Sequence, residues 1–170
     1  NYGTSACWPF IRAEVMTTFQ GEVSQLRSRF EAGGWTQEDL SARLNLPSNY
    51  MSLATEKIPD MLKGLQDALE EGALGIAIPS GYLPGARRQE VYKIYELAGD
   101  LQVPIISHVR EGGTIAIQQA ISNAAITSAP LHIVHINSMA LDEIGLAIEM
   151  VNTAQERGFD ITTELYPYTA

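Results

Sequence analysis

The chain has 170 residues, 45% of them hydrophobic, which is enough apolar material for the core of one domain. Eleven basic and twenty acidic residues give a formal net charge of −9, which argues against binding to nucleic acid or to an anionic membrane surface. No signal peptide is visible, and no apolar run reaches the roughly 18–20 residues that a membrane helix needs. The single cysteine excludes an internal disulfide, so we expect a cytoplasmic protein.

The first sixty residues are the less regular part of the sequence. Residues 2–6 favour a strand, and residues 12–30 have a helical pattern. Residues 37–45 have the pattern of a small helix–turn–helix, but the acidic net charge favours helical packing there over DNA binding. We interpret residues 20–58 as a helical insertion in a single α/β domain that spans residues 1–170.

The second half of the sequence alternates strand-like and helix-like segments. A helix at residues 59–71 precedes four short apolar runs typical of buried strands, at residues 73–78, 103–108, 131–135 and 160–165. Helical patterns lie between these runs, at residues 90–97, 114–123 and 141–156. A strand and a helix repeated at a period of roughly thirty residues predict right-handed βαβ units and a parallel sheet.

Two histidines, His108 and His135, end consecutive predicted strands. Active sites of α/β barrels lie at the C-terminal ends of the strands. Because adjacent strands are about 4.8 Å apart, both rings are within reach of one cation, and imidazole is the commonest protein ligand for a metal. The alternative is that each histidine caps its strand and bonds a loop carbonyl. His132 is an odd number of residues from His135, so we expect it on the opposite, helix-facing or surface side of the sheet.

Other polar residues follow the same strands. Arg110 is suited to hold a substrate carboxylate with two hydrogen bonds, although an ion pair with Glu111 is an equal alternative. Tyr166 and Tyr168 are positioned to donate to a substrate oxygen, or to pack around the proline between them. We expect Cys7 to be a buried thiol rather than a metal ligand.

Four blocks of sequence occur in an order that resembles one known family. They are Gly72–Ile76 with the turn Tyr82–Gly85, then Ser107–Glu111, Ile133–His135 and Glu164–Ala170. Together, over about residues 60–170, they resemble the N-acyl-D-amino-acid deacylases (D-aminoacylases) of the amidohydrolase superfamily. The resemblance implies an α/β fold that is part of a TIM-like (β/α)8 barrel, about strands 3–7, with zinc at the C-terminal mouth.

The resemblance also implies zinc-dependent hydrolysis of the amide bond of N-acyl-D-amino acids. His108 and His135 match the two zinc-binding histidines of the family, and Tyr166 or Tyr168 would contact the substrate carboxylate or amide. Asn137 stands where many members have a lysine that helps to bind the substrate carboxylate. The H-x-H motif of the first strand is absent, and the general-base aspartate of the family would lie outside this chain.

Two alternatives to the deacylase stay open at this point. In the first, the chain is a non-catalytic α/β module or half-barrel that self-associates, because missing barrel strands leave open sheet edges that a homo-oligomer would cover. In the second, the chain derives from another amidohydrolase, such as a dihydroorotase-like cyclic amidase. The Tyr-Pro-Tyr block and the turn at Tyr82–Gly85 favour the deacylase. In that case the substrate is a small molecule, and the isolated chain, with part of the site, is expected to be inactive.

Overall fold

The computed structural model describes residues 4–16 and 46–167, together with a few residues between these ranges, at positions 21, 24–25, 28–29, 32–33 and 36–37. Much of the predicted insertion at residues 20–58 therefore lies outside the described residues, as do most of the predicted helix–turn–helix at 37–45 and Tyr168. The described end of the insertion contains two 3-10 helices, η1 (Pro47–Tyr50) and η2 (Thr55–Lys57).

Parallel strands and helices alternate along the chain, as the sequence predicted. The elements that follow one another are β1 (Ala6–Cys7), α1 (Trp8–Val15), η1, η2, α4 (Ile58–Glu70), β2 (Ile76–Pro79), η3 (Ser80–Tyr82), α5 (Arg88–Leu101), β3 (Ile105–His108), α6 (Thr114–Thr127), β4 (Leu131–Ile133), α7 (Ile136–Ala140), η4 (Leu141–Glu143), α8 (Ile144–Glu156) and β5 (Ile161–Thr163). The sheet has the order β1-β2-β3-β4-β5, and each neighbouring pair is parallel. The prediction of an α/β fold with a parallel sheet is confirmed.

Helix α4 illustrates how local sequence sets these elements. Pro59 lies in its first turn, where a missing backbone N–H costs nothing, and Asp60 complements the positive end of the helix dipole. Met61 and Leu65, one turn apart, are fully buried against the sheet. The helix is followed by Gly72 at φ +110°, a conformation that other residues rarely adopt.

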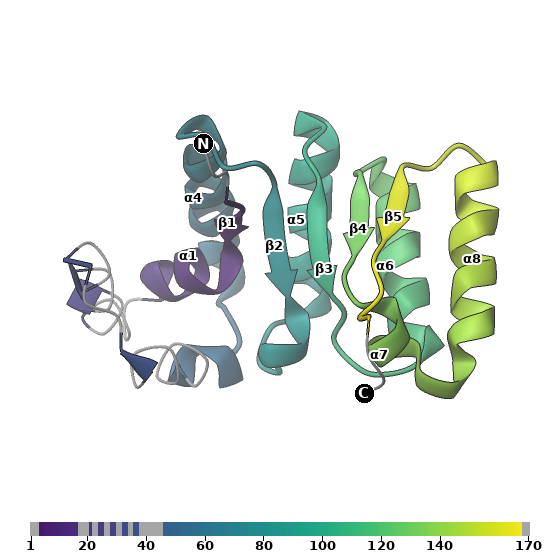
Figure 1. Cartoon of the computed structure of the whole chain (residues 1–170). Helices are drawn as coiled ribbons and strands as arrows, with labels where there is room; N and C mark the ends of the chain where they lie inside the picture. The colour runs from purple at the N-terminus through teal and green to yellow at the C-terminus, as the bar shows by residue number, and fades with distance from the viewer. Residues whose placement is uncertain are drawn as a thin grey trace.

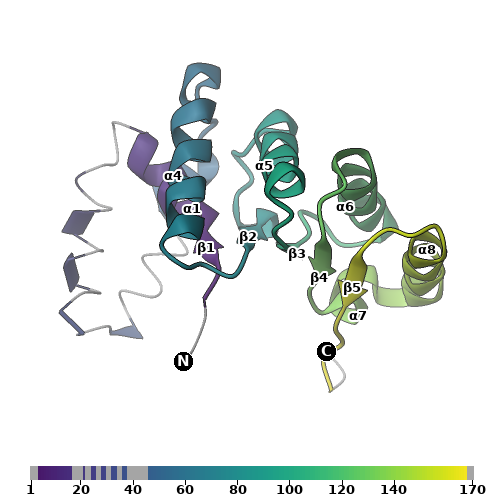
Figure 2. The same ribbon diagram turned by 90° about the horizontal axis from the view of Figure 1, so that it is seen from above.

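Four helices, α4, α5, α6 and α8, cover one face of the sheet (Figures 1 and 2). Alternate strand residues point into this layer and are at most 2% exposed, namely Ile76, Ile78, Ile105, Leu131, Ile133 and Ile161. Burying each such side chain contributes about 1.5–3 kcal/mol. Helix α1 follows β1 directly and lies beside α4, whereas α7 lies at the C-terminal ends of β4 and β5, at the lower edge in Figure 1.

The opposite face of the sheet carries one row of residues in register. Cys7, Ala77, Ile106, His132 and Thr162 are paired in turn across the five strands. Each of the first four is half-buried and Thr162 is exposed, and no helix of the described part of the chain lies over this row (Figure 2). The sheet is therefore covered by helices on one side, and it presents His132 on the other.

Candidate functional site

Four rings form a continuous row at the C-terminal edge of the sheet. His108 is the last residue of β3, and its ring centroid is 4.8 Å from that of His135, with the two planes at 68°. Tyr82, from η3, lies 4.9 Å from His108 on one side. Tyr166 stacks on His135 on the other side, with 4.6 Å between centroids and 2° between planes. The two histidines that the sequence places at consecutive strand ends thus lie side by side.

His108 is held in a defined orientation. Its Nδ1 is 3.1 Å from the carbonyl oxygen of Val109. Because a carbonyl only accepts, Nδ1 carries the hydrogen and Nε2 keeps its lone pair. The hydroxyl of Ser80 donates to the carbonyl oxygen of His108 at 3.0 Å. A Cβ at Gly81 would come within 2.9 Å of His108 Nδ1, so glycine allows η3 to pack directly against the ring.

His135 occupies the turn between β4 and α7. Its backbone is left-handed, with φ 35° and ψ 54°, and the hydroxyl of Ser138 donates to its carbonyl oxygen at 3.0 Å. Nδ1 lies 3.8 Å from Oε1 of Glu164. Burial and the neighbouring His108 lower the pKa of His135, while Glu164 raises it less. At neutral pH His135 is therefore an uncharged imidazole, which is the form that binds metal ions.

The position of His132 corrects a prediction from the sequence. His132 does not lie on the side away from His135, because both rings approach the same carboxylate, that of Glu164, at 3.6 Å and 3.8 Å. Strand β4 ends at Ile133, and the left-handed backbone at His135 breaks the alternation of side chains that the prediction assumed. The face away from the helices, not the helix layer, therefore holds His132.

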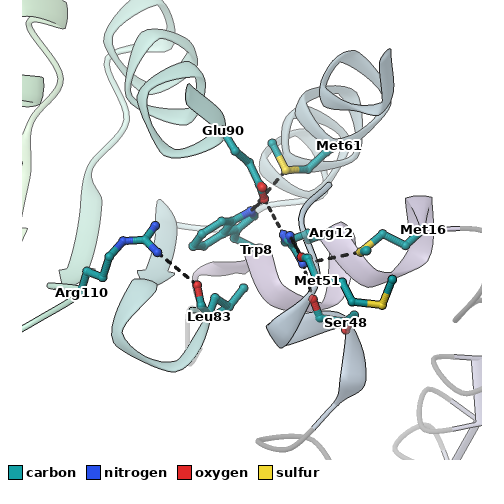
Figure 3. A network of polar contacts seen from close by, with 9 residues as sticks. All are labelled: Trp8, Arg12, Met16, Ser48, Met51, Met61, Leu83, Glu90 and Arg110. Carbon is teal, nitrogen blue, oxygen red and sulfur yellow. Dashed lines mark hydrogen bonds and ion pairs between the residues drawn. The ribbon is translucent and has the colours of Figure 1, made fainter. Parts of the chain in front are cut away.

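The remaining predicted residues are divided between two places. Asn137 lies next to the ring row, and its Oδ1 accepts from the backbone N–H of Tyr166 at 3.0 Å. Arg110 is directed toward the 83–86 loop, where it donates to the carbonyl of Leu83 at 3.3 Å (Figure 3). Burial, together with nearby Arg88, lowers the pKa of Arg110. The sequence analysis did not predict that Tyr82 lies beside His108. Tyr82 follows β2 closely, and β2 pairs with β3 so that its last residue is opposite His108, which is the feature that could have predicted the contact.

A buried ion pair anchors the 83–86 loop, which directly follows Tyr82. The carboxylate of Glu90 accepts from Arg12 Nε at 2.6 Å and from Trp8 Nε1 at 3.0 Å, and Arg12 and Glu90 are each 1% exposed (Figure 3). The other two guanidinium nitrogens donate to the backbone carbonyls of Ser48 and Met51. The Asn49 carbonyl in turn accepts from the N–H of Gly85 at 2.9 Å. This network ties α1, α5, the η1 segment and the 83–86 loop together.

The described residues offer two imidazoles for a metal, but not a complete site. No group of three or more His, Cys, Asp or Glu that could hold a metal ion occurs among them. Zinc takes about four ligands, so His108 and His135 would account for half of its coordination. Cys7, expected to be a buried thiol, is half-buried in β1, two strands away from β3. In the part of the chain that the structure describes, no helix is long and apolar enough to cross a membrane.

Comparison with known proteins gives structural matches only. No family model and no curated protein sequence matches the chain. Its structure is similar to that of N-acyl-D-glutamate deacylase from Bordetella bronchiseptica, which was solved with zinc and a phosphonate inhibitor (TM-score 0.64, 21% identity, 75% of this chain). It is also similar to a D-aminoacylase mutant in complex with copper (TM-score 0.62, 20% identity, 72% of this chain). The chain therefore shares a fold with these deacylases.

A further D-aminoacylase, studied for its binuclear metal centre, matches with a TM-score of 0.62 and 19% identity. These neighbours are TIM-barrel amidohydrolases, which agrees with the predicted barrel class. The chain spans 29% of the length of the glutamate deacylase and 27% of each D-aminoacylase. It therefore corresponds to less than a third of those proteins.

Proposed function

We propose that the intact protein hydrolyses the amide bond of N-acyl-D-amino acids with a bound zinc ion, and that this chain supplies part of the active site. The observation that carries the proposal is the pair His108 and His135. Their rings are adjacent at the C-terminal edge of the sheet, and each directs Nδ1 toward an oxygen atom. The similarity in fold to zinc- and copper-bound deacylases supports the same chemistry.

The two histidines fit a zinc ion in their chemistry. A ring nitrogen that faces a carbonyl or a carboxylate fixes the tautomer, so that the other nitrogen is free to coordinate, as is usual for metal-binding histidines. When bound, zinc would polarise the amide carbonyl and activate a water molecule. The other ligands and the general-base aspartate are proposed to come from outside this chain, which we propose forms a single α/β domain.

Residues around the two rings would bind and orient the substrate. Tyr166 covers one face of His135 and, with Tyr168, would donate to the substrate carboxylate or amide. Asn137 holds the backbone of Tyr166 in place. Asn137 stands where a lysine would supply positive charge, so we propose that the tyrosines contact the substrate carboxylate. Arg110 is proposed to contribute positive charge from the neighbouring loop, where it now bonds Leu83.

Zinc content and activity test this proposal together. In the purified intact protein, His108→Ala and His135→Ala should each lose bound zinc and the release of D-amino acids from N-acyl substrates. Gln118→Ala, on α6 and lining the outer groove between α6 and α8, is the matched control and should keep both. Unchanged zinc content in both histidine variants refutes the ligand assignment. Zinc-dependent activity on cyclic amides alone would favour the dihydroorotase-like alternative.

The uncovered face of the sheet supports a second candidate, a half-barrel that self-associates. Ala77 and Ile106 lie there with no helix of the described chain above them, and β1 and β5 are edge strands. A second copy that pairs with these edges would bury this row. Light scattering over a wide concentration range distinguishes the two cases, because a folded monomer at every concentration contradicts self-association.

A further inference from the structure

His132 is the one histidine that the proposed function leaves unused, and it belongs to a chain of polar contacts. Its Nδ1 is 2.8 Å from the hydroxyl oxygen of Thr162 on the adjacent strand. Its Nε2 lies 3.6 Å from Oε2 of Glu164. The other carboxylate oxygen, Oε1, lies 3.8 Å from Nδ1 of His135. One carboxylate thus stands between two imidazole rings.

The donor and acceptor in each of these contacts follow from which atoms can carry hydrogen. A carboxylate only accepts, so the nitrogens that face it, His132 Nε2 and His135 Nδ1, are the ones that carry hydrogen. His132 Nδ1 is then a bare nitrogen, and the hydroxyl of Thr162 can donate to it. Both N–H groups thus face the carboxylate, and the path ends at His135 Nε2, which keeps its lone pair.

Backbone pairing fixes where Glu164 stands relative to His135. The N–H of Glu164 donates to the carbonyl of Ile133 at 3.3 Å, and the N–H of Ile136 donates to the carbonyl of Glu164 at 3.0 Å. The hydroxyl of Thr163 also donates to the Ile133 carbonyl, at 2.8 Å. These bonds continue the pairing of β4 with β5 past the strand ends. The carboxylate is consequently attached to the sheet and not to a free loop.

We propose that Glu164 is a positioning residue for His135, and that Thr162 and His132 hold its carboxylate in place. The ring of His135 is then fixed on two sides, at its edge by Glu164 and on its face by the stacked Tyr166. A carboxylate behind a metal-binding imidazole sets the ring orientation and makes the coordinating nitrogen more basic. This inference depends on the zinc role proposed for His135.

Zinc affinity, measured on the intact protein by competition with a chromophoric chelator, tests the inference. Glu164→Gln keeps the size of the side chain but removes its charge, and it should weaken zinc binding by about 10- to 100-fold. His132→Gln places an amide N–H where Nε2–H stood and should stay within about threefold of the wild type, whereas His132→Leu should lose about three- to tenfold. The absorption spectrum of the Co²⁺-substituted protein should change in Glu164→Gln and in His132→Leu.

A double variant and a control make the result decisive. If His132 acts through Glu164, adding His132→Leu to Glu164→Gln should cause no further loss of zinc affinity. Glu149→Gln, on α8 and lining the outer groove, should bind zinc like the wild type, and thermal melts of the metal-free proteins check folding. Wild-type affinity in Glu164→Gln, or an equal further loss in the double variant, overturns the inference. If the wild type binds zinc no better than the His108→Ala/His135→Ala double variant, the proposed function fails instead.

Discussion

Replacement of Arg12 by methionine should destabilise the protein more than any exposed substitution. The variant removes four guanidinium contacts, to Glu90, to the sulfur of Met16 and to the carbonyls of Ser48 and Met51. It leaves Glu90 1% exposed, with the N–H of Trp8 as its remaining side-chain donor. Breaking a buried ion pair on one side typically costs about 3–5 kcal/mol. At about 2–4 °C per kcal/mol for a domain of this size, the melting temperature should fall by roughly 6–20 °C.

The loss should depend on pH with a definite sign. Burial raises the pKa of Glu90, against the opposing effects of Arg12 and Trp8. Without Arg12 this pKa rises further, so the folded state takes up a proton at a higher pH than the unfolded state does. The penalty is then complete near neutral pH, and it shrinks as the pH falls through the folded-state pKa toward the ordinary value of about 4.3.

Urea denaturation followed by far-UV circular dichroism measures this free energy of unfolding. Lys63→Met, which breaks an exposed pair with Asp67, is the matched control and should leave the unfolding curve unchanged. Arg12→Met combined with Glu90→Met should recover much of the loss, because no buried charge is left without a partner. A loss below about 1 kcal/mol for Arg12→Met, or a loss that grows as the pH falls, would refute the reasoning.

Two further predictions concern a glycine and the pH range of metal binding. Gly85→Ala should disrupt the 83–86 loop, because its Cβ would lie 2.3 Å from the backbone of Tyr50. Gly145→Ala, whose Cβ would have nothing within 4 Å, should instead stabilise α8 by about 0.5–1 kcal/mol. Chemical denaturation measures both free energies of unfolding, and equal effects of the two variants would contradict the packing. Zinc affinity should hold at neutral pH and fall only below about 6.5, because His135 must be neutral to bind and its pKa is lowered from that ordinary value. Isothermal titration at several pH values measures the affinity, and a pH-independent affinity between pH 5 and 7 would contradict His135 as a ligand.

Local pattern was sufficient to predict the parallel sheet and the proximity of His108 to His135. Short apolar runs at a regular period leave few topologies open, and adjacent strands bring their C-terminal residues together. The prediction for His132 was wrong because a period of two applies only while the strand continues, and the backbone turns into the left-handed region at His135. Nothing in the sequence between His132 and His135 signals that turn, since neither residue nor their neighbours is a glycine.

The network around Arg12 illustrates what sequence patterns do not contain. Arg12 and Glu90 are separated by 78 residues, and each lies in a segment with an ordinary helical pattern. Their pairing follows from the packing of α1 against the sheet and α5, which no local period specifies. The same applies to Arg110, whose bond to Leu83 depends on where the 83–86 loop folds back.

The strand order of the sheet has a consequence for how the site can vary. Because β2 to β5 are adjacent in the order in which they occur along the chain, the four rings also follow the chain order, namely Tyr82, His108, His135 and Tyr166. Each ring comes from the end of a different strand or from the segment that follows it. An insertion or substitution in one of these segments therefore alters a single ring of the row, so that the tyrosines at its two ends can diverge independently while the central histidines stay in place.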